Sequence, residues 1–231
     1  GVFDPTAQWT GFMKPCTLKP LLDLYPKFGM KPSDVMRFKT NIILVEDENM
    51  PIDIKSCMKP GEMTVFVMNR LPAEKLDNFV RRSIQAIFDM RPGESKEIKL
   101  LLVYDEVHRL LPKYGGKKGY VAIERACREF RKWGIGIFLI SQVLLDFKGA
   151  IRANIANEIQ LRTKYEGDIG RVKSKYGIDY ASKVTRLTIG TGLFQNPEFN
   201  HGRPWFVSFR PLLHSPFALT DDEINMYVKL D

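Results

Sequence analysis

The sequence predicts an α/β fold with a mostly parallel central sheet, helices packed on that sheet, and antiparallel strands near the C-terminus. Continuous apolar runs of strand length occur at residues 64–68, 100–104 and 135–140. Such runs are typical of parallel strands that are covered on both faces. Segments with the hydrophobic periodicity of helices lie between these runs, at residues 73–90 and 120–133. Strands and helices that alternate in this way indicate a parallel sheet.

Shorter patterns predict the remaining elements. The chain opens with apolar residues that run into Asp4 and Pro5. Because proline cannot continue a central strand, this indicates a strand with Asp4 at its carboxyl tip. Residues 41–45 and 50–54 flank an acidic turn and predict a hairpin or a pair of edge strands. Further strands are expected at 158–163, 190–195 and 204–209, a basic helix at 167–176, and a last helix capped by residues 220–223.

One domain is expected to span residues 1–231, because a chain of 231 residues can bury a full core. Within this domain, residues 61–212 form the main α/β core. Residues 11–60 begin with a proline-rich stretch that permits only short helices, and we expect them to be an elaboration of the core. Residues 213–231 form a C-terminal tail and helix.

The positive charge of the chain is concentrated in one region. The net charge is +8, and the segment from Lys113 to Arg186 holds 16 Lys and Arg against 7 Asp and Glu. A basic zone of this kind favours a polyanionic partner, either nucleic acid or nucleotide phosphate. A solvated basic surface explains the charge equally well.

The cysteines and histidines exclude some classes of protein. Cys16, Cys57 and Cys127 are widely spaced and odd in number, which is typical of reduced cysteines in a cytoplasmic protein. The three histidines share no metal-ligand spacing, so we do not expect a histidine-based metalloenzyme. No apolar run approaches the roughly 20 residues that a membrane-spanning helix needs.

Two adjacent carboxylates follow the central apolar run. Asp105 and Glu106 come directly after residues 100–104, and open α/β sheets bind ligands at the carboxyl ends of their strands. Such a pair suits phosphate chemistry, since one carboxylate can hold Mg²⁺ and the other can orient the attacking water. An alternative fits the run equally well: a buried strand followed by an acidic helix cap.

Polar residues also follow two other predicted strands, namely Asp4 and the pair Ser141 and Gln142. The ordered set resembles the HerA/FtsK superfamily of RecA-like P-loop ATPases, hexameric DNA motors that include conjugative coupling and secretion ATPases. The resemblance covers residues 63–212 and, more loosely, the opening residues. It is carried by residues 2–9 (the strand after the P-loop helix), 101–106 (the Walker B strand), 128–142 (the helix and sensor strand) and 157–163 (the next strand).

The resemblance implies ATP and Mg²⁺ as cofactors and a role for each site residue. Asp105 would complete the Mg²⁺ shell, and Glu106 would polarise the hydrolytic water. Gln142 would sense the presence of the γ-phosphate by forming a hydrogen bond with it. The alternative is that Gln142 is an ordinary polar residue at a strand end. Arg131 resembles the arginine finger that one subunit supplies to its neighbour. Arg128 competes for that role, and either arginine can instead form a surface salt bridge with Glu124.

The chain also departs from the family pattern, since it contains no GxxxxGK[ST] motif, the Walker A loop that cradles the phosphates. In the family this loop precedes the strand that residues 1–6 resemble. We therefore expect the chain to be the later part of a motor domain that lacks the N-terminal part of its core. Alone, this part is expected to bind nucleotide poorly and to be inactive. A homologue that has lost catalysis is the alternative.

The function that the resemblance implies is ATP-driven DNA translocation or unwinding by a ring, hexameric in the intact protein, that hydrolyses ATP between subunits. DNA would be bound without sequence preference, and a nuclease or a conjugation protein is a further expected partner. Two alternatives remain: a catalytically inactive binding or scaffold module, and a conjugation or secretion ATPase that moves a protein–DNA cargo. Position and charge make four residues candidates for DNA binding: Lys117, Lys118, Lys148 and Arg152.

Overall fold

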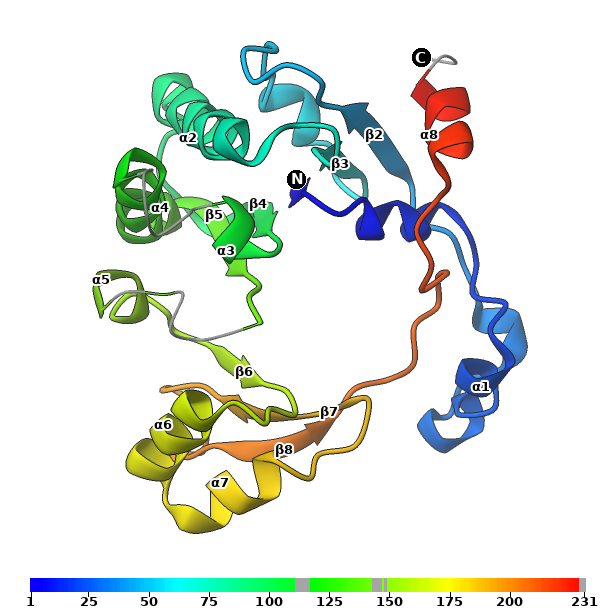
Figure 1. Ribbon diagram of the computed structural model, residues 1–231, viewed down its shortest axis with the longest axis vertical. Coiled ribbons are helices and arrows are strands. Elements are labelled where there is room, and N and C mark those ends of the chain that lie inside the picture. Colours follow the sequence, from blue (N-terminus) through cyan, green and yellow to red (C-terminus); the bar gives the residue numbers. More distant parts are fainter. Residues whose placement is uncertain (111–116, 143–146, 148, 229–231) are drawn as a thin grey trace.

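A computed structural model describes residues 1–110, 117–142, 147 and 149–228. The chain forms a five-stranded sheet and a separate three-stranded sheet (Figure 1). The strands are β1 Val2–Asp4, β2 Thr40–Leu44, β3 Met63–Val67, β4 Ser95–Tyr104, β5 Trp133–Leu139, β6 Glu158–Gln160, β7 Thr191–Gln195 and β8 Trp205–Ser208. The α-helices are α1 Lys19–Leu22, α2 Ala73–Met90, α3 Val107–Leu110, α4 Lys117–Glu129, α5 Gly149–Arg152, α6 Glu166–Tyr176, α7 Ile178–Val184 and α8 Asp221–Val228. The 3₁₀ helices are η1 Gln8–Met13, η2 Tyr25–Phe28, η3 Pro32–Asp34, η4 Lys55–Cys57, η5 Phe130–Lys132 and η7 Asn200–Gly202.

The five-stranded sheet is parallel throughout, with the strand order β2-β3-β1-β4-β5. Strand β1 lies in the middle, where Phe3 pairs in register with Phe66 of β3 and Tyr104 of β4. The Phe3 ring stacks between these two rings, at centroid distances of 5.0 and 4.7 Å. This confirms the predicted α/β class and its mostly parallel sheet.

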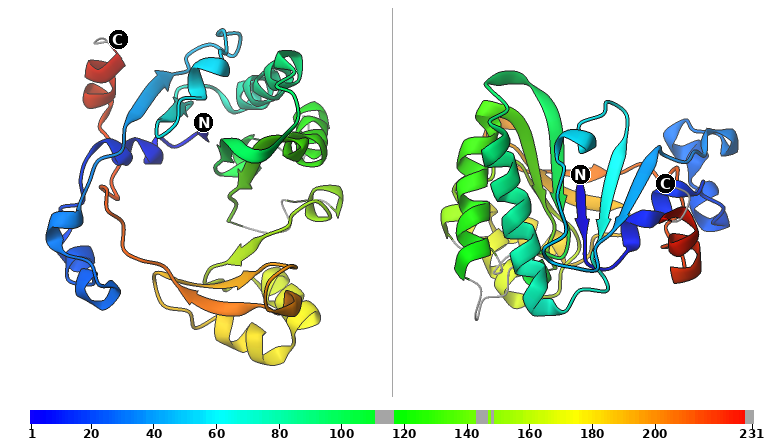
Figure 2. Two further views of the ribbon diagram at one scale, coloured as in Figure 1. Left: turned by 180° about the vertical axis from the view of Figure 1, so that it is seen from behind. Right: turned by 90° about the horizontal axis from the view of Figure 1, so that it is seen from above.

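Helices α2 and α4 cover one face of this sheet (Figure 2, right). Helix α2 places Val80, Ile84 and Ile87 on a single buried stripe. This stripe follows the i, i+4, i+7 spacing of an amphipathic helix, and α2 has the bounds that the sequence predicts. Helix α4 contributes a second buried stripe, formed by Ile123, Ala126 and, just beyond it in η5, Phe130.

The other face of the sheet is covered only in part. Leu219 and Ile224, from the C-terminal segment, pack against Val65 and Val67 of β3. On the other side of β1, Leu101 of β4 is 50% exposed and Phe138 of β5 is 44% exposed. The expectation that β4 and β5 are buried on both faces is therefore wrong at these positions.

A bulge fixes the start of β5 against β4. Between the paired positions Ser95/Trp133 and Leu100/Ile135, four residues of β4 (96–99) oppose one residue of β5, Gly134. Gly134 lies inside the bulge at φ +69°, and a Cβ atom there would lie 2.0 Å from the carbonyl oxygen of Glu97. Only glycine fits both this backbone conformation and this close approach.

Replacing Gly134 by Ala is expected to lower the free energy of unfolding by about 3 kcal/mol, because left-handed strain and backbone overlap act together. Gly29 is a matched control, since its φ is +68° and no atom lies within 4 Å of its Cβ position. Gly29→Ala should cost only about 1 kcal/mol. Chemical denaturation of both variants measures the difference, and equal losses would show that the bulge tolerates a side chain.

The second sheet is antiparallel, with the strand order β6-β7-β8, and helices α6 and α7 pack on one of its faces (Figure 1). Its small core joins Val172, Ala181 and Val184 of the helices to Leu193 of β7. The antiparallel strands near the C-terminus are confirmed. Helix α7 was not predicted, and β6 is shorter than the predicted strand at 158–163.

The segment of residues 11–60 differs from its prediction in one respect. Residues 40–44 form the edge strand β2, which pairs in parallel with β3, so no hairpin exists. Residues 50–54 contain no strand, and Ile54 is buried in the main core. The division of the chain into a core, an elaboration and a tail stays a prediction, although β2 belongs to the main sheet.

Candidate functional site

The carboxyl ends of β1, β4 and β5 bring the predicted polar residues together, because parallel strands end at the same edge of a sheet. The backbone N–H of Asp105 donates to Phe3 O at 3.2 Å, which places Asp105 beside Asp4. The backbone N–H of Ile140 donates to Tyr104 O at 2.9 Å, which places Ser141 and Gln142 beside the end of β4.

Glu106 and Gln142 are in direct contact. The side-chain amide Nε2 of Gln142 donates to Glu106 Oε1 at 2.9 Å, although the two residues are 36 positions apart. The other carboxylate oxygen, Oε2, lies 3.2 Å from Nδ1 of His108. Glu106 has φ +46°, a left-handed conformation that costs a non-glycine residue about 1 kcal/mol or more. Strain of this kind is concentrated at functional sites.

Asp105 is held by two donors. Its Oδ1 accepts from the backbone N–H of Glu106, and its Oδ2 accepts from the indole Nε1–H of Trp9, both at 2.9 Å. A carboxylate offers about four lone-pair positions, so about two stay free for a metal ion or its water ligands. The residue is only partly buried.

Asp4 is fully buried and shapes the loop that follows β1. Its Oδ1 accepts from the N–H and Oγ1–H of Thr6, and its Oδ2 accepts from the N–H of Trp9, each at 2.8 Å. Burial raises the pKa of Asp4 above its ordinary value, and the nearby charge of Asp105 also raises it, while the three hydrogen bonds oppose the shift. Asp4 therefore acts as a structural acceptor that fixes the position of Trp9.

The site fits a metal ion that arrives with phosphates. Within the described ranges, 1–110, 117–142, 147 and 149–228, no cluster of three or more His, Cys, Asp or Glu side chains forms a protein metal cage. Mg²⁺ does not require one, since it is commonly held by one or two carboxylates together with substrate phosphates and water. Asp105 can supply such a carboxylate, and the backbone N–H of Glu106 donates to it at 2.9 Å.

Arg131 does not belong to this cluster within one subunit. It is exposed in η5, just before β5 begins, whereas Gln142 follows the end of β5. The seven residues of β5 separate the two ends by about 20 Å. Arg128 pairs with Glu124 at 3.7 Å, as the alternative reading allows. A catalytic role for Arg131 therefore requires the site of another subunit.

Three of the four candidate DNA-binding residues, Lys117, Lys118 and Arg152, lie in the described part of the chain. Lys117 and Lys118 begin helix α4, so the prediction that they belong to a loop is wrong. Lys148 lies outside the described residues. Arg152 ends α5 and lies near Arg171 of α6. Burial lowers the pKa of Arg171, and the charge of Arg152 lowers it further.

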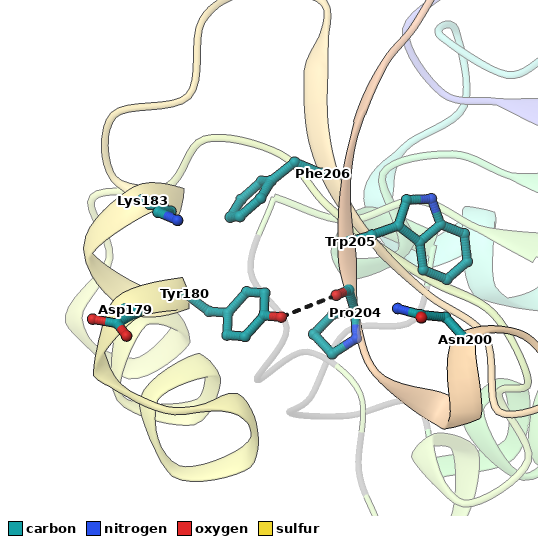
Figure 3. A pocket seen from close by; sticks show the side chains of 7 residues that line it. All are labelled: Asp179, Tyr180, Lys183, Asn200, Pro204, Trp205 and Phe206. Carbon is teal, nitrogen blue, oxygen red and sulfur yellow. Dashed lines mark hydrogen bonds between the residues drawn. The ribbon is translucent and has the colours of Figure 1, made fainter.

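An open pocket of about 460 Å³ lies along β8 and α7 and contains none of the predicted site residues. Tyr180 donates its hydroxyl hydrogen to Pro204 O at 3.2 Å, and its ring stacks on Phe206 at 5.8 Å (Figure 3). In Figure 3, Trp205 projects from the opposite side of β8 to Phe206. The aromatic contacts explain this pocket as part of the packing of α7 on the edge of the second sheet.

Sequence reasoning did not identify Trp9, Thr6 or His108 as parts of the site. His108 could have been identified from the sequence, because it lies only two positions after Glu106. Trp9 and Asp105 are 96 positions apart, and no spacing pattern links them.

Several solved structures share this fold. VirB4 of Thermoanaerobacter pseudethanolicus is 13% identical, with 65% of this chain and 42% of that chain covered and a TM-score of 0.52. The bacterial conjugative coupling protein TrwB is 14% identical, with coverages of 73% and 46% and a TM-score of 0.50. The genome packaging NTPase B204 from Sulfolobus turreted icosahedral virus 2 is 12% identical, with coverages of 90% and 95% and a TM-score of 0.47.

The likeness to VirB4 and TrwB confirms the RecA-like fold that the sequence resemblance implies. The chain spans less than half the length of the VirB4 and TrwB structures. No family model matches the chain, and no curated protein matches its sequence.

Through the described part of the chain, no helix combines the length and the apolar character that crossing a membrane requires.

Proposed function

We propose that this chain is part of a Mg²⁺-dependent ATPase of the HerA/FtsK type. One observation carries the proposal: the Glu106–Gln142 hydrogen bond of 2.9 Å, at the edge of the sheet where Asp105 and Asp4 also lie. A structural ion pair or helix cap has no need of an amide from a second strand. Phosphoryl transfer to water uses three groups: a carboxylate that accepts the proton of the water, a second carboxylate that binds the metal, and a polar group that contacts the phosphate. Glu106, Asp105 and Gln142 are groups of these kinds, and they lie at adjacent strand ends.

Each side chain has a defined task in this reaction. Asp105 would hold Mg²⁺, which supplies positive charge next to the β- and γ-phosphates. Glu106 would orient the attacking water and accept its proton. The Gln142 amide keeps Oε1 of Glu106 in place, and its second N–H and its carbonyl remain available to a phosphate oxygen or to the water.

We propose further that the ATPase is a DNA translocase that works as a ring, hexameric in the intact protein. The basic segment from Lys113 to Arg186 supports a polyanionic partner, and TrwB, which shares the fold, is a conjugative coupling protein. A ring would also give Arg131 a site to act on, because an arginine finger at this position must serve a neighbouring subunit and not its own.

The test is ATP hydrolysis by the intact protein, measured by phosphate release with and without double-stranded DNA. We expect hydrolysis that requires Mg²⁺ and increases when DNA is added. If the rate of ATP hydrolysis does not change when DNA is added, the translocase function is contradicted. If the protein binds DNA but does not hydrolyse ATP, the result supports the inactive binding module instead.

DNA binding should weaken steeply with salt and depend little on sequence. If Lys117 and Lys118 both contact phosphates, Lys117→Ala/Lys118→Ala should reduce the slope of log affinity against log salt by about 2. The control is Lys27→Ala/Lys31→Ala, which removes two exposed lysines outside the basic zone. Fluorescence anisotropy with a labelled duplex at several salt concentrations measures both slopes. An equal change in both variants would assign DNA binding to net charge alone.

A further inference from the structure

A tryptophan side chain reaches the candidate metal-binding carboxylate from a distant part of the chain. The indole Nε1–H of Trp9 donates to Asp105 Oδ2 at 2.9 Å. Trp9 lies in η1, the 3₁₀ helix that follows β1, and Asp105 follows β4. The ring is half-buried, so this bond is formed beside the apolar core and is shielded from competing water on one side.

The position of Trp9 is fixed from several directions. Its backbone N–H donates to the buried carboxylate of Asp4 at 2.8 Å. Its ring stacks on Phe12 with a centroid distance of 5.3 Å and an interplanar angle of 3°. Both contacts hold the indole in one orientation, so its N–H points at Asp105 without further ordering.

The C-terminal segment supports η1 from behind. The backbone N–H of Leu219 donates to Thr10 Oγ1 at 2.8 Å. A Cβ atom at Gly11 would lie 2.6 Å from the carbonyl oxygens of both Ser215 and Phe217, so the two backbones are in close contact. The support of Trp9 therefore extends to residues more than 200 positions away in the sequence.

We propose that Trp9 is a positioning residue that holds the Asp105 carboxylate in the orientation needed to bind a divalent cation. The proposal rests on the proposed function, because it takes Asp105 as the metal-binding residue. With Oδ2 tied to the indole and Oδ1 tied to the N–H of Glu106, the carboxylate cannot rotate about its terminal bond. The lone pairs that remain point away from both donors, where a cation and its water ligands can approach. Residues that orient a metal ligand in this way typically contribute about 10-fold or more to metal affinity.

Mn²⁺ with a non-hydrolysable ATP analogue is a suitable probe for this site in the intact protein, because the site fits a metal ion that arrives with phosphates. Electron paramagnetic resonance distinguishes protein-bound from free Mn²⁺ without any enzymatic activity. Trp9→Phe keeps the stacking ring but removes the N–H donor, and we expect its Mn²⁺ affinity to fall about 10-fold. Trp205→Phe is the matched control, since it makes the same chemical change on β8, and its affinity should equal that of the wild type. Asp105→Asn should weaken binding at least as much as Trp9→Phe.

The outcomes separate the inference from the proposed function. If Asp105→Asn weakens Mn²⁺ binding and Trp9→Phe does not, the positioning role of Trp9 is overturned while the metal role of Asp105 stands. If Asp105→Asn binds Mn²⁺ as the wild type does, or if the wild type shows no saturable binding, the metal role of Asp105 fails and the inference falls with it.

A second measurement tests the contact without metal. The protein has three tryptophans, and Trp→Phe variants assign their indole N–H signals in a nitrogen-15 NMR spectrum. Asp105→Asn should shift the Trp9 signal and leave those of Trp133 and Trp205 in place. An unmoved Trp9 signal would show that the indole does not bond to Asp105 in solution.

Discussion

Replacing Glu106 by Gln in the intact protein is expected to reduce ATP turnover by at least about 100-fold and to leave ATP binding almost unchanged. The substitution keeps the size of the side chain and an oxygen that can accept from Gln142 Nε2. It removes the negative charge that takes the proton from the attacking water. Loss of turnover with retained binding therefore isolates the chemical step from nucleotide affinity.

Single-turnover hydrolysis and equilibrium ATP binding measure the two quantities. Glu129→Gln is the control, because Glu129 forms only a surface ion pair with Lys132 at 2.9 Å near the opposite end of β5. Its turnover should stay within about twofold of the wild type, as expected for an exposed pair. Normal turnover in Glu106→Gln would remove Glu106 from its assigned role.

Replacing Arg131 by Ala is expected to reduce turnover by about 10³-fold or more, if its guanidinium neutralises charge on the transferred phosphoryl group of a neighbouring subunit. The loss should not come from unfolding, since Arg131 is exposed. Arg128→Ala is the control, because Arg128 already pairs with Glu124. Its effect should be small.

Mixing two inactive variants tests the action between subunits. Rings assembled from Arg131→Ala and Glu106→Gln subunits contain some interfaces with both an intact Glu106 and an intact Arg131. Phosphate release from such mixtures should exceed that of either variant alone and vary with the mixing ratio. No recovery at any ratio would contradict an arginine supplied between subunits.

Most of the central sheet could be predicted because its strands are apolar runs of the right length. Helix α2 was predicted with the bounds that the structure shows, since its buried stripe has a clear helical period. Helix α7 was missed because only Ala181 and Val184 of its seven residues are buried, too few to produce a periodic signal. The apolar residues at 50–54 have the pattern of a strand. In the structure, however, Ile54 is buried in the main core without strand pairing.

The candidate site could be predicted where it depends on strand ends. Once the strands were placed, parallel pairing required Asp4, Glu106 and Gln142 to meet at one edge of the sheet. The contact between Trp9 and Asp105 could not be predicted in the same way, because it depends on the path of η1 after β1. That path is set by buried Asp4 and by the C-terminal segment, whose packing leaves no pattern in the sequence.

We propose that Asp105, Glu106 and Gln142 surround the metal and phosphates of a bound nucleotide. Paramagnetic broadening by Mn²⁺ with ATP, measured at side-chain amide signals of the intact protein, tests it most directly. Gln85 on α2 is the internal control, since its amide also bonds to a carboxylate, Asp89 Oδ1 at 2.8 Å. We predict that the Gln142 amide signal disappears at substoichiometric Mn²⁺–ATP while that of Gln85 persists. Equal broadening of the two signals, or an unaffected Gln142 signal, would contradict this arrangement of the site.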